Sequence, residues 1–543
     1  GPGHRPGWVW AKAQHMTVLL ATQAASHAAD GWIALDGAAG AECPPLPDPG
    51  AALEAAFTAS APVWWELGRA LAAGRGAGLA HAPACVANAS DLGQMLAWTR
   101  LIDQWAAEQR RVLVLCRDPW LFRHFAARPG VEPVDRAPPL WPAALRLALR
   151  GLAARGRVAV RMALAAWRLR RQRRAAPTGG AHLLVYGHPA SRPGHDAYFG
   201  GLMAELPELG RVLHVDCPPR RALALAADGR TRALHAWGAP WFALARLPWA
   251  RWRPDLAPVE PGLRWLVRRA AALEGGTGQA AMILWQLHCQ LRWLAAVRPH
   301  RLAWPWENHS WERALVRAAR ARGVATVGYQ HSVIGRQMFN YAAHALADPA
   351  ATLPDRVLCS GAATLEQLAG WGVARSRLAI GGALRFAAPL AVLHDSAAPV
   401  FVALPFDQAV AAEMVAAARA AAAEGWRFVV RDHPMTPFAF AESPGVARAE
   451  GGLGAQAAVA AVVYAATTVG LEAILAGLPT LRFRPAGRVS LDILPEGIAV
   501  PVCDGAGLAA ALAALAPSMA PPGRETVFAA IDPVPWRTLL APD

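Results

Sequence analysis

A histidine–proline pair stands directly behind a short apolar run in the last third of the sequence. The run Arg427–Arg431 reads RFVVR, and His433 and Pro434 follow it after one aspartate. A histidine at the carboxyl end of a strand can donate a hydrogen bond to a phosphate, because ligands of parallel sheets bind at that end. Proline fixes the backbone of the turn that aims the histidine. We therefore expect His433 and Pro434 to belong to an anion site; a purely structural turn is the alternative.

A pair of threonines offers the second part of the same site. Thr467 and Thr468 follow the run AVVYA and precede the helix-like stretch LEAILAGLP. Hydroxyls and free backbone amides at a helix start favour an anion, although simple N-capping would use the same residue types. Glu472 lies one turn into that helix, where its carboxylate can meet the hydroxyls of a ligand. We expect both threonines and Glu472 to join His433 in a nucleotide pocket.

A second polar set follows strand-like runs earlier in the chain. Glu307 comes just after RLAWPW, Gln330 and His331 close the run VATVGYQ, and Asp196 stands before a helix-like segment. A carboxylate there can deprotonate an acceptor hydroxyl or attack an anomeric carbon, and Asp196 and then Glu307 are the candidates. His331 is the third catalytic candidate, for holding a donor carboxylate or positioning the acceptor, and Gln330 is a candidate donor contact. An N-cap for Asp196, a buried structural charge for Glu307 and a core histidine for His331 are the alternatives.

Short β-branched runs alternate with helix-like stretches along most of the chain. This alternation predicts parallel sheets with helices on both faces. The expected strands are Arg111–Cys116, His182–Gly187, Arg211–Asp216, Arg301–Trp306, Val324–Gln330, Arg356–Gly361, Pro399–Leu404, Arg427–Arg431, Ala461–Ala465 and Thr480–Phe483.

So many strands fit two doubly wound domains better than one. We place their joint within 385–396, so that 16–385 is an N-terminal, acceptor-side Rossmann-like domain with helical insertions. Residues 386–543 then form the nucleotide-binding Rossmann-like domain and a proline-containing tail that packs back on the body. Residues 1–15 look like a tag remnant or a disordered extension, because Gly1-Pro2 is what a common tag protease leaves.

The composition bounds the class of protein. Hydrophobic residues make up 54% of the 543 residues and charged residues 17%, which favours a large buried core. The formal net charge is +15, and Lys12 is the one lysine, so arginine supplies nearly all the positive charge. No zinc-finger spacing or RNA-binding signature accompanies it, so we expect no nucleic-acid partner. The odd number of cysteines, seven, without a CxxC pair favours a reducing, cytoplasmic compartment and no structural zinc.

Two segments could meet a membrane surface. Trp141–Arg174 is helix-like and carries arginines between leucine, valine, alanine and tryptophan residues, and Trp237–Trp252 is rich in tryptophan and arginine. Such segments suit an anionic lipid surface, with a solvated helix and ordinary packing as the alternatives. The uncharged run Gly451–Leu471 is long enough to span a bilayer, but its alanine and glycine content favours a buried core segment.

The motifs around the C-terminal site resemble known enzymes. The Glu-Ala…Gly-x-Pro pattern that begins at Glu472 is similar to the nucleotide-sugar helix of GT-B glycosyltransferases. The His-Pro pair followed by a hydroxyl pair resembles bacterial polysialyltransferases, capsule Kdo transferases and CDP-glycerol polymerases. This resemblance covers the last third of the chain and implies that His433 and the hydroxyl pair hold the phosphate of a cytidine nucleotide. Threonines stand here where those families have serines.

The earlier blocks carry a separate resemblance. PWENHSWE, GYQHSVI and DAYFG look like a group of bacterial surface-carbohydrate biosynthesis proteins with a GT-B organisation. Retaining β-Kdo transferases are similar in layout, with an active-site carboxylate in the N-terminal domain. The resemblance leaves open which carboxylate of this chain would take that role.

We therefore expect an α/β protein of the GT-B type, with two doubly wound Rossmann-like domains facing a cleft. The expected activity is transfer of a CMP-activated ulosonic acid, Kdo-like or sialic-acid-like, to a bacterial surface glycan or lipid-linked oligosaccharide of capsule, O-antigen or lipopolysaccharide synthesis. No cofactor and no metal are expected, since no DxD motif is apparent and a histidine with helix amides can stabilise one leaving phosphate. A UDP-, GDP- or CDP-linked donor, a nucleotide-sugar epimerase and a non-catalytic GT-B-like scaffold are the alternatives. The expected location is the cytoplasm, with peripheral binding to the inner membrane surface left open.

Overall fold

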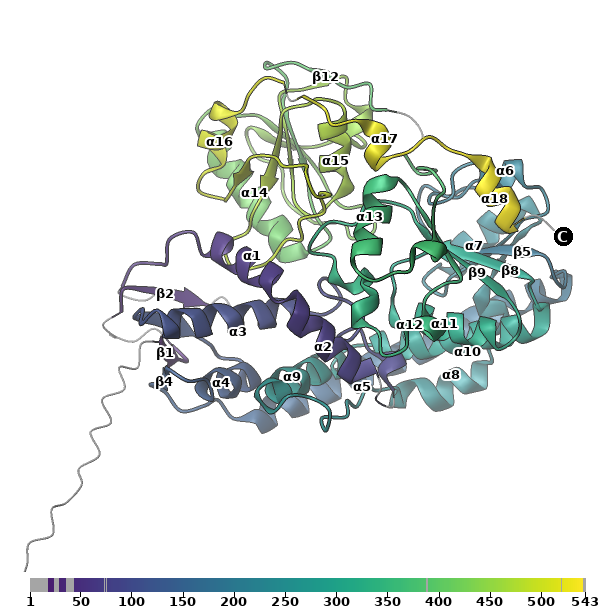
Figure 1. Ribbon diagram of the computed structural model, residues 1–543, viewed down its shortest axis with the longest axis horizontal. Coiled ribbons are helices and arrows are strands. Elements are labelled where there is room, and N and C mark those ends of the chain that lie inside the picture. Colours follow the sequence, from purple (N-terminus) through teal and green to yellow (C-terminus); the bar gives the residue numbers. More distant parts are fainter. Residues whose placement is uncertain are drawn as a thin grey trace, which may run out of the picture.

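The computed structural model describes residues 18–23, 29–35, 43–72, 74, 76–386, 389–518 and 520–540. The segment 1–15 and Met16 lie outside these residues. Within the described ranges, three larger sheets, each with all its strands parallel, follow one another along the chain. Figure 1 shows them as three bodies, with the N-terminal one in purple, the central one in teal and the C-terminal one in yellow-green.

The N-terminal body is built on a four-stranded sheet in the order β2-β3-β1-β4. One face of this sheet carries the larger part of its core, in which apolar residues of four helices from this part of the chain and of the distant helix α9 pack together. The elements are β1 (Val18–Ala21), β2 (Gly31–Ala34), β3 (Val112–Leu115), β4 (Val131–Pro133), α1 (Pro49–Ala59), α2 (Ala61–Ala72), α3 (Leu92–Ala107), α4 (Pro119–Ala126) and α9 (Arg264–Gly275).

The central body has a seven-stranded sheet in the order β11-β10-β9-β8-β5-β6-β7. Neighbouring residues of one strand enter opposite cores: Leu184 packs with helices α5, α10, α11 and α13, whereas Leu183 packs with α6, α7 and α18. This alternation is that of a doubly wound sheet. The strands are β5 (Ala181–Val185), β6 (Gly210–Leu213), β7 (Thr231–Ala233), β8 (Arg301–Pro305), β9 (Ala325–Gln330), β10 (Arg356–Cys359) and β11 (Leu378–Ile380).

The helices of the central body differ widely in length. The longest, α5, spans Leu140–Leu169 and runs along the bottom of the molecule in Figure 1. The others are α6 (Leu202–Glu205), α7 (Pro219–Leu225), α8 (Pro240–Arg246), α10 (Gln279–Val297), α11 (Ser310–Arg320), α12 (Pro349–Thr352) and α13 (Ala362–Gly370).

The C-terminal body has a six-stranded sheet in the order β15-β14-β13-β17-β18-β19. Helices α14 and α16 cover one face and α15 the other, and a separate two-stranded pair joins β12 to β16. The elements are β12 (Leu393–His394), β13 (Val400–Ala403), β14 (Phe428–Arg431), β15 (Val446–Arg448), β16 (Ala458–Val459), β17 (Val462–Tyr464), β18 (Thr480–Phe483), β19 (Val502–Cys503), α14 (Gln408–Ala423), α15 (Thr468–Leu475) and α16 (Leu508–Ala514).

The end of the chain returns to the central body, as the sequence predicts. Helices α17 (Arg524–Val527) and α18 (Pro533–Leu540) cross from the C-terminal body in Figure 1. Trp536 of α18 is fully buried beside Phe199 and Tyr329, and its indole Nε1 donates to the carbonyl of Gly381 at 2.7 Å. This crossing ties the two larger bodies together.

The structure confirms all ten strands expected from sequence, but it also reveals strands and a sheet that were not expected. The strands of 16–385 form two sheets, not one, because β1, β2 and β4 join β3 in a sheet of their own. The two larger bodies each have a parallel sheet with helices on both faces, which is the doubly wound, Rossmann-like α/β arrangement predicted from the sequence. The segment Trp141–Arg174 is helical, as expected, and Gly451–Leu471 is divided between strands and α15. No helix of the described ranges is long and apolar enough to cross a bilayer.

Candidate active site

The strand orders fix where a ligand site is expected. In the central sheet the chain runs from β5 outward to β7 and then returns to place β8 on the other side of β5. The C-terminal sheet makes the same reversal between β13 and β17. Ligands of open parallel sheets bind outside the carboxyl ends of strands at such reversals. The sequence candidates Glu307 and Thr467 follow β8 and β17, so they stand near the two reversal points, and His188, which was not a candidate, follows β5.

We use the term seam for the region where the two larger bodies meet. Its residues are His188, Tyr198, Glu307, His331, Arg385 and His433. The first four come from the central body, Arg385 from the connection between the bodies and His433 from the C-terminal body. Electrostatic coupling joins them across the two bodies, since His433 affects the pKa of His188 and Arg385 affects the pKa of the other five.

The turn that carries Glu307 is held in a demanding backbone conformation. Asn308 has φ of 60°, the left-handed region that few residues other than glycine adopt. The buried carboxylate of Glu312 secures this turn by accepting from the backbone amides of Glu307, Asn308 and His309 at 3.1–3.2 Å. Asparagine tolerates this conformation better than most residues, and the hydrogen bonds to Glu312 fix the turn and with it the position of Glu307.

Glu307 is a charged and accessible carboxylate. Its side chain is 34% exposed, and Oε2 accepts from Nε2 of His309 at 2.7 Å. Desolvation opposes the charge, but the hydrogen bond from His309 and the positive charges of His309 and Arg385 together lower the pKa of Glu307. An exposed carboxylate that is ionised at neutral pH can accept a proton or act as a nucleophile.

His331 lies beside Glu307 as a neutral imidazole. Burial and the charge of Arg385 lower its pKa to about 4, although Glu307 acts in the opposite direction. Its ring stacks edge-on against Tyr198, with 4.8 Å between centroids, and its Nδ1 has no partner among the described residues. A buried nitrogen without a partner costs free energy, so a hydrogen bond to a ligand would relieve that cost. His331 therefore fits the positioning role predicted for it.

Arg385 is the residue that the sequence analysis missed. Its guanidinium lies over the ring of Tyr198, 5.8 Å from the centroid, and it makes no ion pair with a described carboxylate. The same positive charge lowers the pKa of His188, His331 and His433. An arginine at the seam without a carboxylate partner is suited to bind phosphate or carboxylate groups of a ligand. The sequence signal that could have identified Arg385 is its place at the joint between the bodies, shortly after the double glycine that follows β11.

His433 faces the seam from the C-terminal body. Its carbonyl accepts from the amide of Thr436 at 3.0 Å, which closes the turn that contains Pro434. Burial, followed by the charge of Arg385, lowers the pKa of His433. His188, in the other His-Pro pair of the sequence, occupies the matching position after β5 and comes close enough to feel the charge of His433. The two His-Pro pairs therefore face the seam from opposite bodies.

The threonine pair begins helix α15 as predicted. Thr467 is the N-cap and its Oγ1 accepts from the amide of Val469 at 3.5 Å, while Thr468 is the first helical residue. The preceding Ala466 has φ of 48°, a second left-handed residue at a strand-to-helix turn. This geometry leaves the Thr468 hydroxyl and the first helix amides as the parts of the pair suited to a phosphate.

Glu472 sits one turn further along α15, at a small cavity that Phe386 and Arg524 also line. Burial raises the pKa of Glu472, and the charges of Arg385 and Arg524 oppose that rise. Its carboxylate is therefore coupled to the same arginine as the seam histidines. This position is compatible with hydrogen bonds to the hydroxyls of a ligand.

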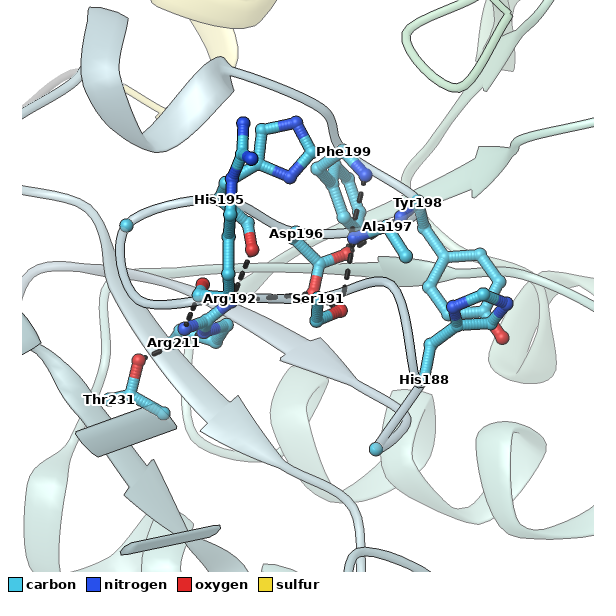
Figure 2. Close-up of polar contacts among 12 residues, drawn as sticks. His188, Ser191, Arg192, His195, Asp196, Ala197, Tyr198, Phe199, Arg211 and Thr231 are labelled. Carbon is cyan, nitrogen blue, oxygen red and sulfur yellow. Dashed lines mark hydrogen bonds and ion pairs between the residues drawn. The ribbon is translucent and has the colours of Figure 1, made fainter. Parts of the chain in front are cut away.

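Asp196 has a structural environment, which Figure 2 shows. The side chains of Asp196 and Arg211 are both fully buried and 3.7 Å apart. The Asp196 carboxylate also accepts from the amides of Tyr198 and Phe199 and from the hydroxyl of Ser191. These contacts hold the loop that presents Tyr198 to the seam. Because the carboxylate has no exposed surface, we do not assign it the base or nucleophile role, and Glu307 is the better candidate.

Gln330 is also occupied within the protein. Its side chain is 1% exposed and Oε1 accepts from the amide of Ser332 at 3.0 Å. Its expected contact with a donor is therefore not available in this arrangement. Gln330 instead shapes the turn that carries His331.

A cavity of about 640 Å³ lies elsewhere in the described part of the chain. Gly180, Gly210 and His300 line it, at the amino ends of the central strands. It is thus on the edge opposite the seam. No group of three or more histidine, cysteine, aspartate or glutamate side chains suited to a metal ion is found in the described ranges.

No protein-family model and no curated protein matches the chain. Solved structures that resemble it include the glycosyltransferase of kitacinnamycin, at 13% identity over 62% of this chain and 91% of that one, with a TM-score of 0.36. A UDP-GlcNAc 2-epimerase from Neisseria meningitidis, bound to UDP-GlcNAc, is 11% identical over 56% and 82%, with a TM-score of 0.32. MurG of Acinetobacter baumannii is 11% identical over 60% and 87%, with a TM-score of 0.30.

Proposed function

We propose that this protein is a glycosyltransferase that uses a nucleotide-activated sugar as its donor. The observation that carries the proposal is the pairing, at one seam, of an arginine without a carboxylate partner and an accessible, ionised carboxylate: Arg385 and Glu307. The arginine suits the phosphate that leaves, and the carboxylate suits the reaction at the sugar.

The reaction divides between the two larger bodies. The bond between the anomeric carbon and the phosphate oxygen breaks, and its electron pair leaves with the nucleotide phosphate toward Arg385, His433 and the first amides of α15. The acceptor oxygen forms the new bond. In a single displacement Glu307 takes the acceptor proton. In a double displacement Glu307 first attacks the anomeric carbon and expels the phosphate, and the acceptor oxygen then displaces the Glu307 carboxylate while its proton passes to the departing nucleotide phosphate. The anomeric configuration of the product distinguishes the two routes.

For the donor we propose a CMP-linked ulosonic acid. Such a donor carries one phosphate and one carboxylate, and the seam combines the cation of Arg385 with the imidazoles of His188, His331 and His433. Arg385 and the N-terminus of α15 suit the phosphate, whereas His331, with its unsatisfied Nδ1, suits the carboxylate. UDP-, GDP- and CDP-linked sugars are the competing donors for the same site, and epimerisation is the competing reaction. We propose that no metal is needed.

Donor turnover tests this proposal. Release of CMP from CMP-Kdo or CMP-sialic acid should be measurable with chelator present, and Glu307→Gln should lower the rate by at least about a hundredfold. Asp216→Asn, a change at another acidic residue that follows a strand of the central body, is the matched control. Turnover of UDP-sugars alone would show that the donor is UDP-linked and not CMP-linked. The absence of turnover with every donor would favour a non-catalytic scaffold.

We further propose that the acceptor is a lipid-linked glycan, met at an anionic membrane surface. The exposed residues of α5 support this: Trp141, Leu145, Leu149, Leu152, Val160, Leu164 and Trp167 recur at spacings of three to eight residues and form one apolar stripe. Neighbouring arginines flank the stripe, and α5 contains no acidic residue. Trp241 and Trp249, each about 70% exposed, extend the surface over α8 and the turn that follows it. An apolar stripe edged only by cations suits an anionic bilayer.

A further inference from the structure

A cysteine from the N-terminal body lies directly behind the candidate catalytic carboxylate. Sγ of Cys85 is 3.1 Å from Nδ1 of His309, whose Nε2 is 2.7 Å from Oε2 of Glu307. One imidazole thus connects a thiol on one side to the seam carboxylate on the other. Cys85 is 4% exposed, so it does not reach the seam itself.

The loop that carries Cys85 is anchored on both sides. Its turn is closed by hydrogen bonds from the amides of Ala84 and Cys85 to the carbonyl of His81, at 2.8 and 2.7 Å. The carboxylate of Glu274 in α9 accepts from the amides of His81 and Ala82. The backbone that carries the thiol is therefore held by contacts within the N-terminal body.

The charges around Cys85 favour its ionised form. His309 lies closest, Nδ1 of His81 is 3.7 Å away, and the buried guanidinium of Arg313 in α11 is coupled to the thiol. Although burial opposes ionisation, the two histidines outweigh it and the pKa of Cys85 is lowered to about 6. The pKa of His309 is correspondingly raised, with burial opposing and Cys85 and Glu307 favouring the cation.

Other ionisable groups, on the elements packed around the Cys85–His309 pair, also influence its charges. Glu312 and His81 affect the charge of His309, Glu274 affects that of His81, and the phenol of Tyr341 is coupled to Cys85. The thiols of Cys217, Cys359 and Cys503 are coupled to no histidine, and burial raises the pKa of each to about 12. Cys85 therefore differs from these buried thiols of the chain.

We propose that Cys85 is a positioning residue: as a thiolate it holds His309 as an imidazolium, which in turn fixes the Glu307 carboxylate and offsets its charge beside an anionic donor. The catalytic consequence rests on the proposed function of Glu307, but the ion pair itself does not. Without the thiolate, the pKa of His309 would fall, and Glu307 would face the donor without the imidazolium over a wider range of pH.

The ion pair is tested by thiolate absorbance in the far ultraviolet, which needs no substrate. The difference between wild type and Cys85→Ser should contain one thiolate that titrates near pH 6. Cys359→Ser, a buried thiol whose pKa is raised, should leave that step unchanged. A wild-type protein without a thiolate between pH 6 and 8, or a step that survives in Cys85→Ser, would overturn the proposal.

The rate of donor turnover tests the positioning role of Cys85 separately from the ion pair. Cys85→Ser should lower kcat about tenfold above neutral pH and move the alkaline limb of its pH profile to lower pH, and Cys85→Asp should restore the limb by supplying another anion. An unchanged profile in Cys85→Ser, with the absorbance step present, would show that the ion pair has no positioning role. If no donor is turned over, the absorbance result still decides whether the ion pair exists.

Discussion

Oε1 of Glu54 accepts a hydrogen bond from Nη2 of Arg482 at 2.6 Å, although the two residues stand 428 positions apart in the sequence. Glu54 belongs to α1 of the N-terminal body and Arg482 to β18 of the C-terminal body. Oε2 of the same glutamate accepts from Arg484 at 2.9 Å. One carboxylate therefore ties the first helix of the chain to its last body.

Removing this carboxylate should destabilise the protein measurably. In Glu54→Ala the Arg482 guanidinium, whose side chain is 5% exposed, would be left buried without its partner, at a cost of about 3 kcal/mol. Thermal unfolding checks this, with Glu366→Ala as the control because its pair with Arg375 is largely exposed. We expect no measurable change in the control. Equal melting temperatures for the two variants would mean that the contact contributes nothing to docking.

Asp196→Asn separates the structural role from a catalytic one. The change would leave the Arg211 guanidinium without full charge compensation and should lower the melting temperature, while the folded fraction keeps most of its turnover. Both properties should be measured on the same preparation, beside Glu307→Gln. A variant of wild-type stability with abolished turnover would return the catalytic role to Asp196.

Nucleotide binding should strengthen as the pH falls. The pKa of His188 is lowered to about 4 and that of His433 is also lowered, so both rings are neutral in the free protein at pH 7. A bound phosphate raises both pKa values, so binding takes up protons and Kd falls with pH, by up to about tenfold per unit for each proton. Calorimetric titrations between pH 8 and 6 check this, and His433→Ala should reduce the slope. Binding that does not vary with pH would contradict the placement of the phosphate.

The stripe on α5 should bind anionic vesicles. Co-sedimentation with phosphatidylglycerol vesicles should exceed that with phosphatidylcholine and weaken with added salt, because arginines surround the apolar residues. Replacing Trp141, Trp167 and Trp249 by alanine should abolish it, whereas Leu393→Ala, an exposed leucine of the C-terminal body, should not. If the triple variant instead loses a concentration-dependent dimer and the wild type binds no vesicle, the stripe is a contact between copies of the chain.

The sequence predicts the strands that are buried on both faces better than it predicts the edges. RVLVLC and PVFVAL are continuous apolar runs, and both form central strands of their sheets. Edge strands such as β7 and β15 have three residues each and include an arginine, so neither forms a continuous apolar run. VLLA, at Val18–Ala21, becomes a central strand of the N-terminal sheet only through its pairing with β3 and β4.

The residues of the candidate site likewise divide into those that the sequence predicts and those that it does not. Glu307, His331 and His433 are predictable because each follows a recognisable strand, and the topology brings those ends together. Arg385 and Cys85 follow no strand of that kind, and they reach the site through the connection between bodies and through a loop of another body. Asp196 has a helix-start pattern, and only its buried ion pair with Arg211 indicates its structural role.

The most direct test of the account is thermal unfolding with CMP, CDP, UDP and GDP, on wild type, Arg385→Gln and His433→Ala, with Arg375→Gln as the control. A nucleotide at a hundred times its Kd stabilises the folded protein by about 2.7 kcal/mol. We predict a shift with cytidine nucleotides in wild type and the control, and weaker binding in Arg385→Gln by about 2 kcal/mol, or thirtyfold in Kd. A shift that is undiminished in Arg385→Gln and His433→Ala, or no shift with any nucleotide, would contradict the assignment of the seam as the donor site.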